Sequence, residues 1–306
     1  IKGIYCASVT PFNSDYSINK KLLLEHCNNL LSQNVEGIAI FGTTGEANSL
    51  SLEQKIESIE YLLKNNFDPN KLIVGTGLNS ITDTIKFTKI VSNLNVKTVL
   101  VLPPSYYKNI TSEGIVDYYS RLVEEVNETN LSYLLYHIPQ MSGVNIDFNV
   151  IEKLLSKYSK NIVGIKDSSG DEENTIKMAK VFSEFSILSG SDSFVLKLLK
   201  NGGAGAITAT SNISAKLLAF IFNNFQNAST ISNFDELQNL QSEIRSFVFN
   251  HEPISTLKAF ISLRDGNPDW NRLLPPLCIL QNEQTNKSMI KLKELVNKMN
   301  FLLSDF

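Results

Sequence analysis

A lysine at the end of an apolar run is the residue of this chain that is best placed to do chemistry. Residues 161–166 read Asn-Ile-Val-Gly-Ile-Lys, and a polar stretch beginning with Asp167 follows at once. Burial disfavours the charged form of an amine, so the pKa of Lys166 should fall and the neutral amine would be a nucleophile. The alternative is a lysine whose stem lies along the strand end while its ammonium reaches solvent.

A Gly-Thr-Thr-Gly-Glu turn at residues 42–46 follows another apolar run. Its two hydroxyls and its backbone N–H groups suit a carboxylate, which binds several convergent donors. The alternative is a helix start in which Glu46 or Ser49 leads into the next helix. Both interpretations can hold at once.

Two aromatic motifs follow further apolar runs. Residues 136–139 read Tyr-His-Ile-Pro, and Tyr136 could exchange protons with an amine or be an ordinary core tyrosine. His137 should point away from Tyr136 by strand alternation, so we interpret it as structural. Tyr106 and Tyr107, after Pro103-Pro104-Ser105, could form a pocket wall, a packing pair or a contact with a neighbouring subunit.

Short β-branched runs alternate along the chain with amphipathic segments of helical period. The predicted strands are residues 4–9, 37–41, 72–75, 98–102, 133–136, 162–166, 186–189 and 205–208. The predicted helices between and after them are residues 20–31, 52–65, 82–92, 114–126, 149–158, 173–185, 194–200 and 215–225. Beyond about residue 226 the pattern predicts only helices, at 234–250, 253–264 and 286–304.

Eight βα units predict an α/β fold, a (β/α)8 TIM barrel at residues 1–226, with a C-terminal helical extension at residues 227–306. A doubly wound open sheet is the alternative, but no Gly-x-Gly-x-x-Gly follows the first strand. In such a barrel the active site lies at the C-terminal ends of the strands, where all the motifs above fall. Because the motifs all fall at this end of the barrel, we expect their residues to form a single site.

Composition narrows the classes of function. The net charge is −3, and 42% of residues are hydrophobic, which gives no electrostatic footprint for nucleic acid. No apolar run approaches a membrane span, and no N-terminal signal peptide is apparent. Cys6, Cys27 and Cys278 are far apart and suit a reducing compartment. We therefore expect a cytoplasmic protein that binds neither membrane nor nucleic acid, with its other lysines on solvated helix faces.

Metal and serine chemistry find little support. The three histidines, His26, His137 and His251, share no ligand spacing, and no Gly-x-Ser-x-Gly elbow is present. We expect no metal site.

These residues together resemble the dihydrodipicolinate synthase / N-acetylneuraminate lyase family of class I, Schiff-base aldolases. The resemblance covers nearly the whole chain. It is carried by Val9-Thr10-Pro11-Phe12, the 42–46 turn, Tyr106-Tyr107, Tyr136-x-x-Pro139, Gly164-Ile165-Lys166, Ser189-Gly190-Ser191-Asp192 and the 202–212 region.

The resemblance implies roles for individual residues. Lys166 would form the Schiff base, Tyr136 would transfer protons, Thr44 would complete the proton relay, and Tyr107 would be borrowed by a neighbouring subunit. Substrate binding is implied for Thr43, Thr44, Ser168, Gly190, Asp192 and Ile207. The family is usually a homotetramer, a dimer of dimers, that needs no metal or organic cofactor. Its substrates are pyruvate or related 2-oxo acids and an aldehyde.

Three positions bear on the substrate. Met141 stands where the synthases carry an arginine for a second carboxylate, and methionine cannot make that pair. Ser193 and Ala209 stand where the sialic acid lyases carry an acidic residue and a serine. The residues therefore favour an aldolase that cleaves a 2-keto-3-deoxy sugar acid to pyruvate and an aldehyde. The alternatives are dihydrodipicolinate synthase, N-acetylneuraminate lyase, a dehydratase of similar substrates, or an inactive barrel that only binds 2-oxo acids.

Overall fold

The computed structural model describes residues 1–280 and 283–304. Its eight strands follow one another in chain order around a closed barrel, and the pairs with a described register are parallel. The predicted (β/α)8 barrel is confirmed, and the doubly wound sheet is excluded. The strands are β1 (Gly3–Ala7), β2 (Gly37–Ile40), β3 (Leu72–Gly75), β4 (Thr98–Val101), β5 (Ser132–His137), β6 (Ile162–Asp167), β7 (Ser186–Ser189) and β8 (Gly205–Thr208).

The chain forms two compact units. The first contains Ile1–Lys2 and Asp68–Ile207, and the second contains Gly3–Phe67 and the residues from Thr208 onward. The C-terminal helices thus belong to the same unit as β1 and β2. The boundary predicted between residues 226 and 227 stays a prediction.

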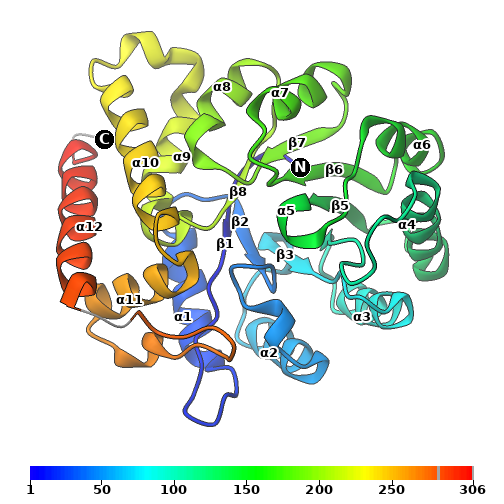
Figure 1. The fold of residues 1–306 in the computed structure, drawn as a ribbon, viewed down its shortest axis with the longest axis horizontal. Helices are drawn as coiled ribbons and strands as arrows, with labels where there is room; N and C mark the ends of the chain where they lie inside the picture. Colours follow the sequence, from blue (N-terminus) through cyan, green and yellow to red (C-terminus); the bar gives the residue numbers. More distant parts are fainter. Residues whose placement is uncertain (281–282, 305–306) are drawn as a thin grey trace. The chain divides into compact units, whose positions relative to one another are not determined.

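In the first unit, helices alternate with β3 to β8. They are α3 (Ile81–Asn93), α4 (Ser112–Val126), α5 (Pro139–Ser142), α6 (Phe148–Tyr158), α7 (Glu172–Val181) and α8 (Val195–Lys200), with short 3-10 turns η2 (Pro69–Lys71) and η3 (Asp192–Phe194). α4 lies beside α6 (Figure 1). A side-chain oxygen caps the N-terminus of most of these helices, as Ser80, Thr111, Asp147 and Asp171 do.

The second unit holds the remaining helices. They are α1 (Lys20–Leu31), α2 (Leu52–Lys64), α9 (Ser211–Asn224), α10 (Phe234–Phe249), α11 (Pro253–Asp265) and α12 (Glu283–Leu302), with 3-10 turns η1 (Ala47–Ser49), η4 (Phe225–Thr230) and η5 (Pro268–Asn271). α10 packs against α12 and α9 (Figure 1). No helix in the described part of the chain is both long and apolar enough to cross a membrane.

Several elements differ from the sequence prediction, among them α9, which begins at Ser211 and not at residue 215. The helix predicted at residues 173–185 ends at Val181, because Phe182 leaves helical geometry and packs against Phe148 and Phe185. The short helix α5 was not predicted, since four residues give no period; Pro139 opens it and Gly143 closes it in the left-handed conformation.

Candidate active site

Lys166 and Tyr136 form a buried pair at the ends of β6 and β5. The two residues lie opposite each other in the parallel ladder. The Lys166 Nζ donates to the Tyr136 phenol oxygen at 3.4 Å and lies 4.4 Å from the centre of the ring. Each residue is only 4% exposed. The amine therefore makes a long hydrogen bond to the phenol, of the kind that can tighten when substrate binds, and the interpretation of Lys166 as a solvent-reaching lysine is wrong.

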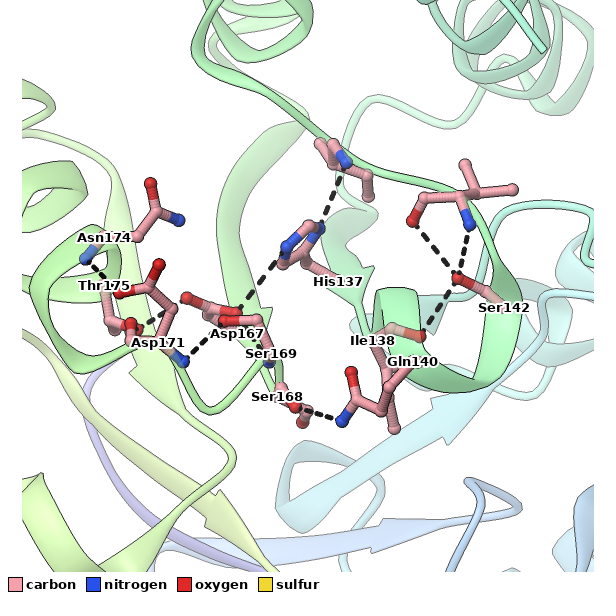
Figure 2. A network of polar contacts seen from close by, with 12 residues as sticks. His137, Ile138, Gln140, Ser142, Asp167, Ser168, Ser169, Asp171, Asn174 and Thr175 are labelled. Carbon is pink, nitrogen blue, oxygen red and sulfur yellow. Dashed lines mark hydrogen bonds and ion pairs between the residues drawn. The ribbon is translucent and has the colours of Figure 1, made fainter. Parts of the chain in front are cut away.

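His137 lies one residue beyond Tyr136, and alternation turns its side chain to the other face of the strand. The Ile146 N–H donates to His137 Nδ1 at 3.1 Å, so the ring proton resides on Nε2. This nitrogen faces Asp167 Oδ1 at 4.0 Å (Figure 2). Burial lowers the pKa of His137, and the Asp167 carboxylate opposes that shift. His137 is thus a neutral anchor for the chain that follows α5, in agreement with its structural interpretation.

Asp167, the residue after Lys166, is buried, and both of its carboxylate oxygens accept hydrogen bonds. Its carboxylate accepts hydrogen bonds from the Ser169 N–H at 2.9 Å and from the Thr175 hydroxyl at 2.6 Å (Figure 2). Its carbonyl oxygen accepts from the Gly190 N–H at 2.7 Å. These bonds fix the end of β6, and with it the backbone that carries Lys166.

The predicted substrate residues Ser168 and Gly190 lie side by side. A Cβ added at Gly190 would lie 2.0 Å from Ser168 Oγ, so only glycine fits there without moving Ser168. The Ser168 carbonyl also accepts from Gln140 Nε2 at 2.7 Å (Figure 2). Asp192 and Ile207 are both fully buried, the first at the start of η3 and the second in β8.

Tyr107 is not part of the buried Lys166–Tyr136 pair. Its side chain is 72% exposed, and its ring packs edge-on against Tyr106, with ring centres 5.5 Å apart. The neighbouring Lys108 ammonium donates to the Ser142 carbonyl at 2.8 Å, which ties this loop to α5. Met141, also in α5, is 62% exposed.

The 42–46 turn, in the second unit, is closed by its own backbone. The N–H groups of Gly45, Glu46 and Ala47 donate to carbonyls of Gly42 and Thr43 at 3.1–3.2 Å. These three N–H groups serve the turn itself and are not donors for a ligand. Thr43 and Thr44 are half-buried.

The sequence suggested that Glu46 or Ser49 leads into the helix after the turn, but neither residue caps α2. The cap is Ser51, which forms a reciprocal capping box with Gln54. Glu46 instead makes a buried ion pair with Lys258 of α11, at 2.8 Å, with both side chains 0% exposed. Burial lowers the pKa of Lys258 to about 8, and Glu46 opposes the shift.

The buried lysines correct the expectation that lysines other than Lys166 lie on solvated faces. Lys258 and Lys55 are both buried, and burial lowers the pKa of Lys55 to about 8 as well. The sequence held a weak signal for Lys258, which lies among Leu257, Phe260 and Ile261 in α11.

Asn212 is a structural centre that the sequence did not reveal. Its Oδ1 accepts from the Val9 N–H at 3.1 Å and faces His26 Nε2 at 2.9 Å. Its Nδ2 donates to the carbonyls of Ala7 and Ala209. One buried amide therefore joins α1, the end of β1 and the start of α9.

No group of three or more His, Cys, Asp or Glu side chains within residues 1–280 and 283–304 is arranged to hold a metal ion. His26 and His137 are instead occupied by Asn212 and by the Ile146 N–H.

Comparison with known proteins identifies the family. A sequence model of the Dihydrodipicolinate synthetase family matches residues 1–295. A protein of Chloroflexus aurantiacus named "Uncharacterized DapA-like lyase" is 33% identical over 287 residues, 92% of this chain and 93% of that protein. The chain belongs to the dihydrodipicolinate synthetase family. Members of this family are lyases and aldolases, and this chain is accordingly an enzyme of that class.

Two further members of the family extend the comparison. The 4-hydroxy-tetrahydrodipicolinate synthase of Ehrlichia canis is 31% identical over 300 residues, 96% of this chain and 97% of that protein. The solved 4-hydroxy-tetrahydrodipicolinate synthase of Methylacidiphilum fumariolicum SolV superposes with a TM-score of 0.88 at 26% identity, over 100% of this chain and 99% of that one.

Proposed function

We propose that this enzyme is a class I pyruvate aldolase in which Lys166 forms a Schiff base with the 2-oxo carbon of its substrate. The observation that carries the proposal is the buried contact of Lys166 Nζ with the Tyr136 phenol at 3.4 Å. A lysine beside a proton-transferring group, away from bulk water, is the arrangement that imine chemistry requires. Family membership supports the same chemistry.

The reaction begins when the neutral Lys166 amine adds to the carbonyl carbon of the 2-oxo acid. Tyr136 delivers the proton that lets the carbinolamine lose water and become a protonated imine. In cleavage, Tyr136 then takes the proton of the C4 hydroxyl while the C3–C4 bond breaks, and the imine receives the electron pair as an enamine. Protonation at C3 and hydrolysis release pyruvate and regenerate the amine. Because the imine is the electron sink, the proposed reaction takes no metal or organic cofactor.

The carboxylate of the substrate is assigned to Thr43 and Thr44, whose hydroxyls are the donors of the 42–46 turn. Such donors fix the carbonyl carbon for attack and stabilise developing charge. Thr44 also belongs to the proposed proton relay. Contacts with the rest of the substrate are assigned to Ser168, Gly190, Asp192 and Ile207.

The substrate that we propose is a 2-keto-3-deoxy sugar acid, cleaved reversibly to pyruvate and an aldehyde. The Met141 side chain is exposed on α5. It carries no charge, so it cannot bind a second carboxylate in the way that an arginine does. Ser193 and Ala209 replace the acidic residue and the serine of the sialic acid lyases. Two polar contacts to the long sugar chain of a sialic acid are therefore missing.

A 4-hydroxy-tetrahydrodipicolinate synthase is the second candidate. Relatives that carry this name cover nearly all of the chain at 31% and 26% identity. Such an enzyme would condense pyruvate with aspartate semialdehyde and would need another residue in place of a carboxylate-binding arginine. The two activities separate cleanly when the purified enzyme is assayed for pyruvate release from 2-keto-3-deoxygluconate and for pyruvate consumption with aspartate semialdehyde. Cleavage alone supports the aldolase, and condensation alone supports the synthase. If the enzyme shows neither activity, both candidate functions are refuted.

The exposed aromatic pair supports an oligomer. Tyr106 and Tyr107 are 78% and 72% exposed, which is costly for two adjacent aromatic rings unless a partner covers them. We propose a homotetramer, a dimer of dimers, in which Tyr107 completes the site of a neighbouring copy. A cytoplasmic location belongs to the same proposal, because the spacing of the three cysteines suits a reducing compartment.

A further inference from the structure

Glu46 adopts a backbone conformation that needs support. Its φ of 57° and ψ of 32° lie in the left-handed region, which costs energy for a residue with a side chain. Both carboxylate oxygens are held: Oε1 by the Lys258 ammonium at 2.8 Å and Oε2 by the Leu274 N–H at 2.9 Å. The side chain thus pins the last residue of the 42–46 turn in place.

Lys258 uses its ammonium on three partners in the same neighbourhood. It donates to Glu46 Oε1, it donates to the Thr10 carbonyl at 2.9 Å, and it lies 4.3 Å from the centre of the Phe12 ring. Thr10 in turn donates its hydroxyl to the Gly45 carbonyl at 2.8 Å. The ammonium therefore reaches the turn by two routes, through Glu46 and through Thr10. We call Thr10, Glu46, Lys258 and Leu274 the turn clamp.

Stability alone does not call for charges at this place. Burying an ammonium and a carboxylate costs desolvation that their attraction only partly returns, and apolar side chains of similar size often fill such a site equally well. Directional hydrogen bonds, in contrast, fix a particular backbone geometry. The turn clamp holds a turn in which every N–H from Gly45 to Ala47 already has a set partner.

We propose that Lys258 is a positioning residue for the substrate carboxylate, because it fixes the 42–46 turn and thereby the hydroxyls of Thr43 and Thr44. The inference rests on the proposed function of that turn. It gives α11, in the C-terminal helical region, a part in substrate binding that acts through the 42–46 turn.

Two readouts test the proposal on the full-length enzyme. The first is hydrogen exchange of the Gly45, Glu46 and Ala47 amides in Lys258→Met, which keeps an unbranched side chain, one atom shorter, and removes its charge. We expect exchange to be at least about 10-fold faster, since the local opening energy falls when the turn clamp is lost. The second is the split between KM and kcat. We expect the KM for pyruvate to rise by about 10-fold, or about 1.4 kcal/mol of binding. We expect kcat to fall by a smaller factor, because Lys258→Met keeps the hydroxyls of Thr43 and Thr44 and only loosens the turn that carries them.

Three further variants separate positioning from loss of stability. Because Lys258→Met leaves a carboxylate buried without its partner, Glu46→Gln/Lys258→Met is measured alongside and removes both charges. Lys298→Met is the matched control, since Lys298 pairs with Glu236 at the same 2.8 Å but both side chains are about half exposed. Leu237→Ala, in the core of α10, lowers global stability without touching the turn clamp.

The outcomes are distinct. Faster exchange and a raised KM in both clamp variants, with neither change in the two controls, support the proposal. Unchanged exchange, or a KM that rises equally in Leu237→Ala, overturns it. Failure of the wild-type enzyme to form any borohydride-trapped adduct with pyruvate is a different result. It refutes the proposed function itself, and the carboxylate assignment with it.

Discussion

Acid should destabilise this protein through His26 in particular. The ring is buried against Trp270, with ring centres 4.9 Å apart. Asn212 Oδ1 already accepts from the Val9 N–H, so it acts as an acceptor toward His26 and the Nε2 carries the proton. Burial lowers the pKa of His26 to about 4, and the bond to Asn212 offsets only part of the shift.

The size and sign of the effect follow from this pKa. In the unfolded chain the histidine has a pKa of about 6.5, so between about pH 6.5 and pH 4 the unfolded state binds a proton that the folded state refuses. The stabilisation is therefore complete above pH 6.5 and is lost as the pH falls toward 4, by up to about 1.4 kcal/mol per pH unit. The expected loss at pH 5 is about 2 kcal/mol.

Urea unfolding of the wild type and of His26→Gln at pH 7 and pH 5 measures this effect. Glutamine keeps an N–H donor for Asn212 but does not titrate, and the contribution of His137 is common to both proteins. The wild type should lose about 2 kcal/mol more than the variant between the two pH values. Equal losses would show that His26 binds its proton as readily in the folded protein as in the unfolded chain, and would refute the reasoning.

Two further predictions concern the site. Tyr136→Phe should lower kcat by about 10²–10⁴-fold while pyruvate binding changes little, because it removes a general acid–base; steady-state kinetics near the wild-type rate would remove Tyr136 from that role. Gly190→Ala should displace Ser168, since the new Cβ would lie 2.0 Å from its Oγ, and should lower kcat/KM by about 10-fold or more; a crystal structure with Ser168 unmoved would contradict this.

The barrel was predictable because its signals are local. Each strand is a short apolar run, and predicted and observed strand bounds agree within two residues, as at 72–75 and 205–208. The pairing of Tyr136 with Lys166 was predictable for the same reason, since both close such runs and parallel strands end on one rim.

Contacts between residues distant in the chain were not predictable. Lys258 pairs with Glu46, which lies 212 positions earlier in the sequence. The sequence around a lysine on an amphipathic helix does not indicate which distant residue it will contact. The same holds for Asn212, whose amide joins residues about 200 positions away. The end of α7 at Val181 was not predicted, because Phe182 leaves the helix to pack against Phe148 and Phe185 although the sequence keeps a helical period.

Borohydride reduction of the enzyme with pyruvate, read by peptide mass spectrometry, tests the Schiff-base chemistry most directly. The account predicts a pyruvate-derived adduct on Lys166, and the same adduct when 2-keto-3-deoxygluconate is supplied, with Lys166→Ala folded but free of adduct. An adduct from pyruvate alone would keep the chemistry and contradict the sugar-acid substrate. No adduct, or an adduct on another lysine, would contradict the central claim that Lys166 is the nucleophile.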